Sequence, residues 1–144
     1  MIDFHTHILP NMDDGSDSVA TSIELLNILK NEGVELVCLT SHFYSRNESI
    51  EDFLVRRNKQ YNKLNYPDLD IRLGAEIHYY RGISASTDIE KLCIQGTKIL
   101  LIELSFSSPI SDFVIREIMN LKNKGFTVVL AHIERYNLKI DVLE

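Results

Sequence analysis

The sequence predicts an α/β fold built on parallel strands, either barrel-like or open. Apolar runs alternate with helical patterns along all 144 residues, and this alternation implies βαβ units. The runs KILLIEL and FTVVLA are apolar on both faces, as in parallel strands that are covered on both sides. The length fits one domain, residues 1–144, and no repeat or linker divides it.

Five short apolar runs are expected to form the strands. The runs are bounded by polar residues or glycine and are too short for helices. Cys38 lies within the second run, where a lone cysteine acts as a small buried hydrophobe. The strands are expected at residues 1–5, 36–40, 71–77, 99–104 and 126–131.

Four helices are expected between these strands, from apolar side chains three or four residues apart. In the last helix Val114, Ile118 and Leu121 share one face, and Gly125 follows as a stop signal. The second helix is more polar and therefore more exposed, and the third is short and weakly patterned. The helices are expected at residues 16–33, 49–64, 84–92 and 110–124, and residues 137–144 read as the start of a further helix.

Composition and charge exclude several classes of function. The net charge of −6 disfavours a nucleic-acid surface, which needs a basic stripe. No run approaches the ~20 apolar residues of a membrane helix, and the first residues lack a signal-peptide pattern, so a cytoplasmic location is expected. A cysteine phosphatase needs an arginine six positions after its cysteine, but Tyr44 and Ile99 occupy those positions.

Residue types that bind metals recur where the expected strands end. The carboxyl ends of parallel strands share one edge of the domain, so these side chains should converge. Glu103 lies in the apolar run LLIELS, where an ionised carboxylate needs a partner. The recurring residues are His5, His7, His42, Glu76, Glu103 and His132.

Each of these residues taken alone also has a structural explanation. A single histidine at a strand end can simply be hydrogen-bonded, and Asp13 and Asp14 can start a turn or cap a helix. Together they form an imidazole and carboxylate set without thiolate, which suits manganese, iron or zinc. The set exceeds the needs of one tetrahedral ion. It therefore indicates a multinuclear site, whose usual chemistry is an in-line displacement between oxygens.

Five stretches, taken in order, resemble the polymerase-and-histidinol-phosphatase (PHP) superfamily. They are DFHTHILPNMDDGS, LTSHFY, GAEIHYY, LIELS and AHIERY, and they span residues 3–136. More narrowly, they resemble the bacterial manganese-dependent protein tyrosine phosphatases of capsule and exopolysaccharide synthesis. This resemblance implies a PHP-type distorted (β/α) barrel.

The resemblance also implies roles for particular residues. Glu103 would bridge metals, and Arg135 would be the catalytic, substrate-binding group that holds phosphate oxygens. A guanidinium fork suits that task, although a surface salt bridge is the alternative for Arg135. Hydrolysis would proceed by a metal-activated hydroxide, and the partner would be a phosphotyrosine protein, in particular a bacterial tyrosine kinase. The implied manganese ligands are His5, His7, Asp14, His42, Glu76, Glu103 and His132.

The chain departs from this family at its C-terminal side. A closed barrel of this type has ~250 residues, and the later part of the family carries an Asp and His motif with two further ligands. No histidine follows His132. We therefore expect a C-terminally truncated PHP-like catalytic domain with an open, apolar sheet edge, which favours a homo-oligomer. The alternatives are a PHP phosphoesterase for histidinol phosphate or another small ester, and a non-catalytic domain that binds metal or phosphate.

Overall fold

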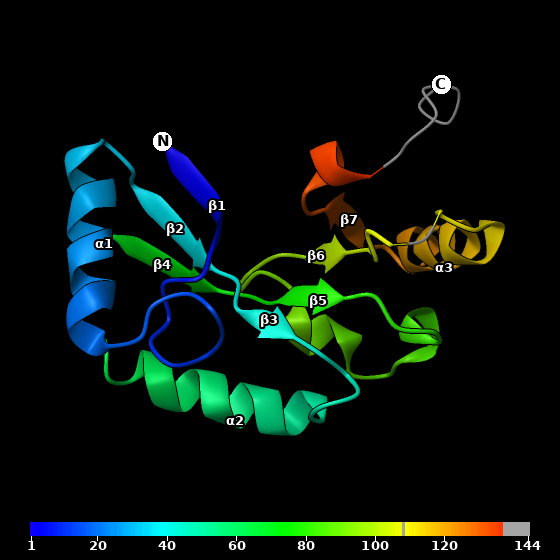
Figure 1. The fold of residues 1–144 in the computed structure, drawn as a ribbon, viewed down its shortest axis with the longest axis horizontal. Coiled ribbons are helices and arrows are strands. Elements are labelled where there is room, and N and C mark those ends of the chain that lie inside the picture. Colours follow the sequence, from blue (N-terminus) through cyan, green and yellow to red (C-terminus); the bar gives the residue numbers. More distant parts are fainter. Residues whose placement is uncertain (108, 137–144) are drawn as a thin grey trace.

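The computed structural model describes residues 1–107 and 109–136, and the helix expected at residues 137–144 lies outside them. Figure 1 shows their arrangement. The strands are β1 (Ile2–Thr6), β2 (Leu36–Leu39), β3 (His42–Phe43), β4 (Asp70–Leu73), β5 (Glu76–His78), β6 (Ile99–Glu103) and β7 (Thr127–Leu130). The helices are α1 (Val19–Asn31), α2 (Ile50–Tyr61) and α3 (Asp112–Asn123), with 3-10 turns η1 (Ile83–Ala85), η2 (Ile89–Leu92) and η3 (Ile133–Arg135).

The described strands form two sheets in which every pairing is parallel. Their orders are β1-β2-β4 and β3-β5-β6-β7. In Figure 1, α1 lies beside the first sheet, α2 runs below β3, and α3 lies at the far side near β7. The expected α/β class with parallel strands is confirmed.

The single strand expected at residues 71–77 is wrong, because it is divided into β4 and β5 in different sheets. Gly74 and Ala75 separate the two parts. A Cβ atom on Gly74 would lie 2.5 Å from Ile94 Cδ1. Ile94 packs closely against the backbone at Gly74. This is a tertiary contact, and the apolar pattern of residues 71–77 gives no sign of it.

Backbone hydrogen bonds continue across this division. β2 ends at Leu39 and β3 begins at His42, so the neighbouring segment breaks at the same level. Gly74 N donates to Leu39 O at 3.0 Å, and Glu76 N donates to Thr40 O at 3.1 Å. The two sheets are therefore parts of one bent surface. The bend places His42 and Glu76 opposite each other at the start of the second sheet.

The α-helices begin at serine caps, one to three residues later than the sequence pattern indicates. Residue 16 is outside α1 because Ser16 N donates to His7 O at 3.0 Å, which keeps it in the preceding loop. A serine hydroxyl that accepts from a first-turn amide stabilises a helix start by ~1 kcal/mol. The three caps are Ser18 with Thr21 N at 3.1 Å, Ser49 with Asp52 N at 3.0 Å and Ser111 with Val114 N at 3.4 Å.

The helix expected at residues 84–92 is wrong, because this segment forms the two 3-10 turns η1 and η2. Ser86 between them is extended, with φ −63° and ψ 129°. Ile83, Ile89 and Leu92 are buried. Their burial in the core fixes the path of the connection and outweighs the weak helical pattern.

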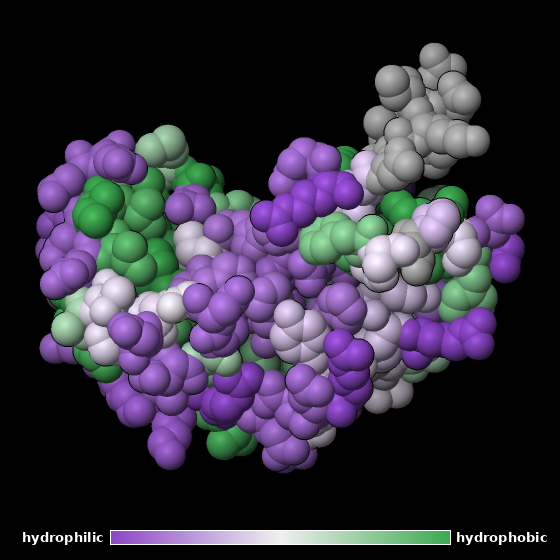
Figure 2. Space-filling view, in the orientation of Figure 1, coloured by the Kyte–Doolittle hydropathy of each residue, from purple (hydrophilic) through white to green (hydrophobic). Residues whose placement is uncertain are grey.

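The core lies between the sheet and its helices. Leu26, Phe53 and Leu121, one from each α-helix, are fully buried. Cys38 is buried, as expected, and is not in a disulfide. Figure 2 shows a hydrophilic surface across the middle of one face and a hydrophobic surface over α1. Among the described residues, no helix has the length and apolar character needed to cross a membrane.

Candidate metal centre

The Glu76 carboxylate lies at the centre of a cluster of histidines. Its side chain is fully buried, and its Oε2 lies 3.0 Å from Nε2 of both His5 and His7. His42 Nδ1 lies 3.2 Å from Oε2, and His132 Nε2 lies 3.0 Å from Oε1. Four imidazoles thus converge on one carboxylate: His5 and His7 come from the end of β1, His132 follows β7, and His42 begins β3 directly after β2. The expected position at a strand end is wrong for Glu76, which begins β5.

The local geometry explains how these side chains meet. His5 and His7 are two residues apart, and residues at this spacing along an extended chain share one face. His132 follows β7 and has φ 54°, a left-handed conformation that is uncommon outside glycine. Gly15 is required in the first loop, since a Cβ atom there would lie 2.0 Å from His7 O.

The charges in the cluster are strongly coupled. Burial raises the pKa of Glu76, but the imidazoles of His5 and His7 outweigh it and hold this pKa well below its usual range. Burial lowers the pKa of His7, but Asp13 and Glu76 outweigh it and raise this pKa to about 10. The carboxylates therefore draw positive charge into the cluster.

The cluster also leaves polar atoms without regular partners. Neither oxygen of Glu76, nor His42 Nδ1, has a hydrogen bond of good geometry from the described residues. His5 Nε2 and His7 Nε2 lie 3.2 Å apart. Buried acceptors without partners are costly, and a cation among these atoms would satisfy them. The residues present thus fit a metal ion.

Glu103 lies on the neighbouring strand, where it contacts His78. His78 Nδ1 is 3.1 Å from Glu103 Oε2, and the two residues are register partners between β5 and β6. Ligand atoms of His42, Glu76 and Glu103 all lie within 4.8 Å of one another. His78 is absent from the sequence-based set. Its spacing of two from Glu76 is the signal that could have found it, because alternate strand residues share a face.

The two aspartates of NMDDGS have different positions. Asp13 Oδ2 lies 2.8 Å from His7 Nδ1 and accepts a hydrogen bond from His42 N at 2.8 Å. The side chain of Asp14 is 84% exposed, and its Oδ1 lies 3.8 Å from His42 Nε2. Asp14 is therefore on the exposed side of the cluster, where its ligand atom lies within 4.8 Å of those of His7 and His42. Asp13 instead holds the imidazole of His7 and the backbone N–H of His42 from behind, as partners of metal ligands do.

Arg135 lies at the rim beside His132. Its side chain is 60% exposed, and its Nε is 3.8 Å from Glu134 Oε1. Its guanidinium lies 5.6 Å from the centre of the Phe106 ring, which in turn contacts the His132 ring at 6.0 Å. Arg135 thus has a surface ion pair and also lies beside the cluster. Its place in the structure fits both a surface salt bridge and a phosphate-binding role.

Tyr44 is the tyrosine of the ligand motifs that contacts the histidines. Its ring centre lies 5.3 Å from those of both His42 and His78. Tyr79 instead donates a hydrogen bond to Glu117 Oε2 at 2.6 Å. Tyr80 packs against Phe43. The structure therefore brings all seven expected ligands into one region and adds His78. Asp14 belongs to it through a group with His7 and His42, whose ligand atoms lie within 4.8 Å of one another.

Comparisons with known proteins identify the family of this chain. The family model for capsular polysaccharide synthesis, CpsB/CapC, matches residues 1–143. Tyrosine-protein phosphatase CpsB of Streptococcus agalactiae is 29% identical over 142 residues, which are 95% of this chain and 58% of that protein. Tyrosine-protein phosphatase YwqE of Bacillus subtilis is 33% identical over 143 residues, 94% of this chain and 55% of that protein.

The fold is also similar to a solved structure, described as one of YwqE from Bacillus subtilis and CpsB from Streptococcus pneumoniae, unique metal-dependent tyrosine phosphatases. The TM-score is 0.73 and the identity 30%, over 94% of this chain and 57% of that chain. The chain thus spans a little over half the length of these relatives. The resemblance inferred from the five stretches is confirmed, and the chain belongs to the CpsB/CapC family of capsular polysaccharide synthesis.

Proposed function

We propose that this chain provides a metal-dependent active site that hydrolyses phosphotyrosine in proteins. The observation that carries the proposal is the buried Glu76 carboxylate with four imidazole nitrogens within 3.2 Å. The names of the relatives support the reaction, since they are tyrosine-protein phosphatases. The chain covers 58% of the Streptococcus agalactiae relative, so its own turnover is the quantity to measure.

The donor set supports manganese as the metal, with iron or zinc as the other metals that such donors accept. His5, His7 and Glu76 form one group of ligand atoms, and His42, Glu76 and Glu103 form another. Bound ions would supply Lewis acidity, which lowers the pKa of water and stabilises charge on phosphate oxygens. The proposed ligands are His5, His7, Asp14, His42, Glu76, Glu103 and His132.

The other side chains of the site would position the substrate. We assign Arg135 to the phosphate, because an exposed guanidinium fork can donate to two of its oxygens at once. The Phe106 ring, 5.6 Å from this guanidinium, favours its position by a cation–π contact. Tyr44 offers an aromatic surface next to His42 for the substrate ring. Asp13 would keep His7 in one orientation.

The proposed substrate is a phosphorylated tyrosine of a bacterial kinase that regulates capsule and exopolysaccharide synthesis, in the cytoplasm. The description of the family, capsular polysaccharide synthesis, supports the link to capsule synthesis. The alternatives are a small phosphate ester such as histidinol phosphate, and binding of metal or phosphate without turnover.

The test is a titration of metal-free protein with manganese, in which hydrolysis of a phosphotyrosine peptide and of histidinol phosphate is followed. The variant Glu76→Gln removes the central charge. The matched control is Glu35→Gln at a surface position, where the side chain is 87% exposed. Manganese-dependent peptide hydrolysis that is lost in Glu76→Gln and kept in Glu35→Gln supports the proposal.

The other outcomes separate the alternatives. Faster hydrolysis of histidinol phosphate would replace the phosphotyrosine assignment with a small ester. Tight manganese binding without turnover would make the chain a binding domain. If the protein shows no manganese binding and no turnover, the metal centre is refuted.

A further inference from the structure

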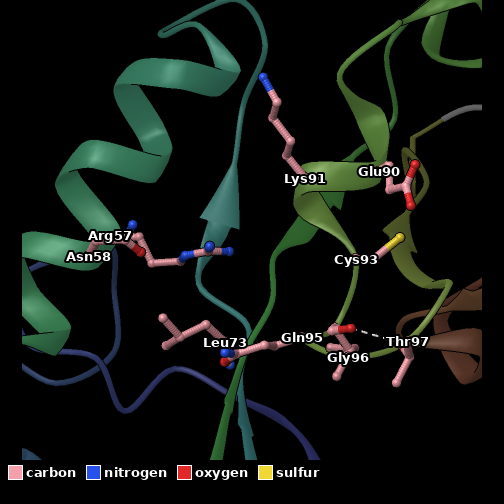
Figure 3. A pocket seen from close by; sticks show the side chains of 10 residues that line it. Arg57, Asn58, Leu73, Glu90, Lys91, Cys93, Gln95, Gly96 and Thr97 are labelled. Atoms are coloured by element: carbon pink, nitrogen blue, oxygen red, sulfur yellow. Dashed lines mark hydrogen bonds between the residues drawn. The ribbon is translucent and has the colours of Figure 1, made fainter.

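A cavity of about 490 Å³ lies between α2 and the segment that joins η2 to β6 (Figure 3). Thr97 lines it and precedes β6, whereas Glu103 ends β6, so the cavity and the metal cluster lie toward opposite ends of this strand. Six residues of extended chain span ~20 Å. The cavity is therefore distinct from the candidate metal centre.

Arg57 of α2 is a buried cation at this cavity. Its side chain extends from the helix toward the cavity (Figure 3), and the residue is 8% exposed. Nη1 donates to Gly74 O at 2.9 Å, and Nε is buried with no hydrogen-bond partner among the described residues. No ion pair within the described parts of the chain includes Arg57. Burial lowers the pKa of this guanidinium to about 10.

The other charges at the cavity are already compensated. Lys91 Nζ lies 2.7 Å from Asp88 Oδ1, and Glu90 Oε1 lies 3.1 Å from Lys98 Nζ. Arg57 therefore carries the charge that lacks a counter-ion within the described residues. A buried charge without a counter-ion is costly, and an anion in the cavity would reduce that cost.

We propose that this cavity binds the oxyanion group of a small molecule, a carboxylate or a phosphate, with Arg57 as its counter-ion. The planar guanidinium presents donors in a fork that matches either group. The side-chain amides of Asn58 and Gln95 also line the cavity and offer polar contacts. The volume falls within the ~300–1,000 Å³ of small-molecule pockets. The inference does not depend on the proposed phosphatase activity.

The test uses metal-free protein, so that it is separate from turnover and metal binding. Inorganic phosphate and succinate are titrated separately at constant ionic strength, and backbone amide chemical shifts are followed by NMR. We expect saturable shifts at residues 57–58 and 93–97. Binding of phosphate alone identifies a phosphorylated ligand, and binding of succinate alone identifies a carboxylate ligand.

Variants decide whether Arg57 is responsible. Arg57→Met should weaken binding at least 10-fold. The matched control is Arg116→Met, because Arg116 is an exposed arginine of α3 and is not among the residues that line the cavity; this variant should bind as the wild type does. If Arg57→Met does not fold, Asn58→Tyr serves instead, because this exposed helix position lines the cavity and a ring there should obstruct it.

Three results would overturn the proposal. The first is the absence of saturable shifts at the residues of the cavity. This result includes the case in which shifts occur only at the histidine cluster. The second is an equal loss of binding in Arg57→Met and Arg116→Met, which would indicate a general charge effect. The third, where Asn58→Tyr is used, is unchanged binding. Arg57 would then serve only to hold the Gly74 carbonyl.

Discussion

Glu76 and Glu103 lie on neighbouring strands and differ in how the protein surrounds them. Glu76 begins β5, is fully buried and has four imidazole nitrogens within 3.2 Å. Glu103 ends β6, its side chain is 10% exposed, and it contacts one imidazole, that of His78. The resemblance gives Glu103 the bridging role. The geometry indicates instead that Glu76 is the residue on which the site depends most.

The largest expected effect is that of Glu76→Gln on metal binding. The substitution removes the charge shared by four imidazoles, so manganese affinity should fall by more than the ~100-fold upper range for partners of metal ligands. Isothermal titration calorimetry on metal-free protein measures it. Affinity that stays within 10-fold of the wild type would remove Glu76 from its central place.

Asp13→Asn should have the next largest effect, although Asp13 points at histidines and not at the proposed metal position. Loss of its contact with His7 should lower manganese affinity by about 10- to 100-fold. Asp14→Asn, at an 84% exposed side chain, should lower it less. The reverse order would restore Asp14 as the essential ligand and reduce Asp13 to a turn residue.

Glu103→Gln should lower manganese affinity by about 10-fold, at the lower end of the same range. The groups around Glu76 remain intact in this variant, so at least one ion should stay bound. Metal analysis after dialysis gives the ratio of manganese to protein. A complete loss of metal, equal to that in Glu76→Gln, would show that the two carboxylates are equivalent.

The smallest effect is a pH dependence of the stability of metal-free protein. The raised pKa of His7, about 10, stabilises the fold below about pH 6.5, and this contribution is lost as pH rises through about 10. The lowered pKa of Glu76 stabilises the fold above about pH 4.5, and this contribution is lost as pH falls further. The thermal midpoint should therefore be highest between about pH 4.5 and about pH 6.5, where both contributions are present.

Thermal unfolding of metal-free protein across this pH range measures the effect. Glu76→Gln provides the comparison, because it removes the Glu76 carboxylate and with it a negatively charged neighbour of His7. Parallel curves for the wild type and this variant would show that the coupled charges around Glu76 do not contribute.

The sequence predicts most of the site because its signals are local. Glu103 and Glu76 stand out as carboxylates in apolar strands, and the strand-end rule places His42 and His132 beside them. His78 could also be found from its spacing to Glu76. The choice between Asp13 and Asp14 could not, since both occupy the same loop and either can start a turn.

The tertiary structure decides that choice through contacts between distant residues. Asp13 faces inward because the loop is closed by Ser16 N donating to His7 O and by Asn11 N donating to Ser16 O at 2.8 Å. In the same way, the packing of Ile94 against Gly74 divides the strand at residues 71–77. Neither contact leaves a periodic signal in the sequence.

The sequence by itself determined the α/β class with parallel strands, the helices that became α1, α2 and α3, and the class of metal donors. Hydrophobic periodicity and the cost of a buried carboxylate are properties of short segments, so they can be read residue by residue. Only the tertiary structure decided that Glu76 is central and that Arg57 is buried with no counter-ion among the described residues, because burial and pairing depend on which distant segments pack together.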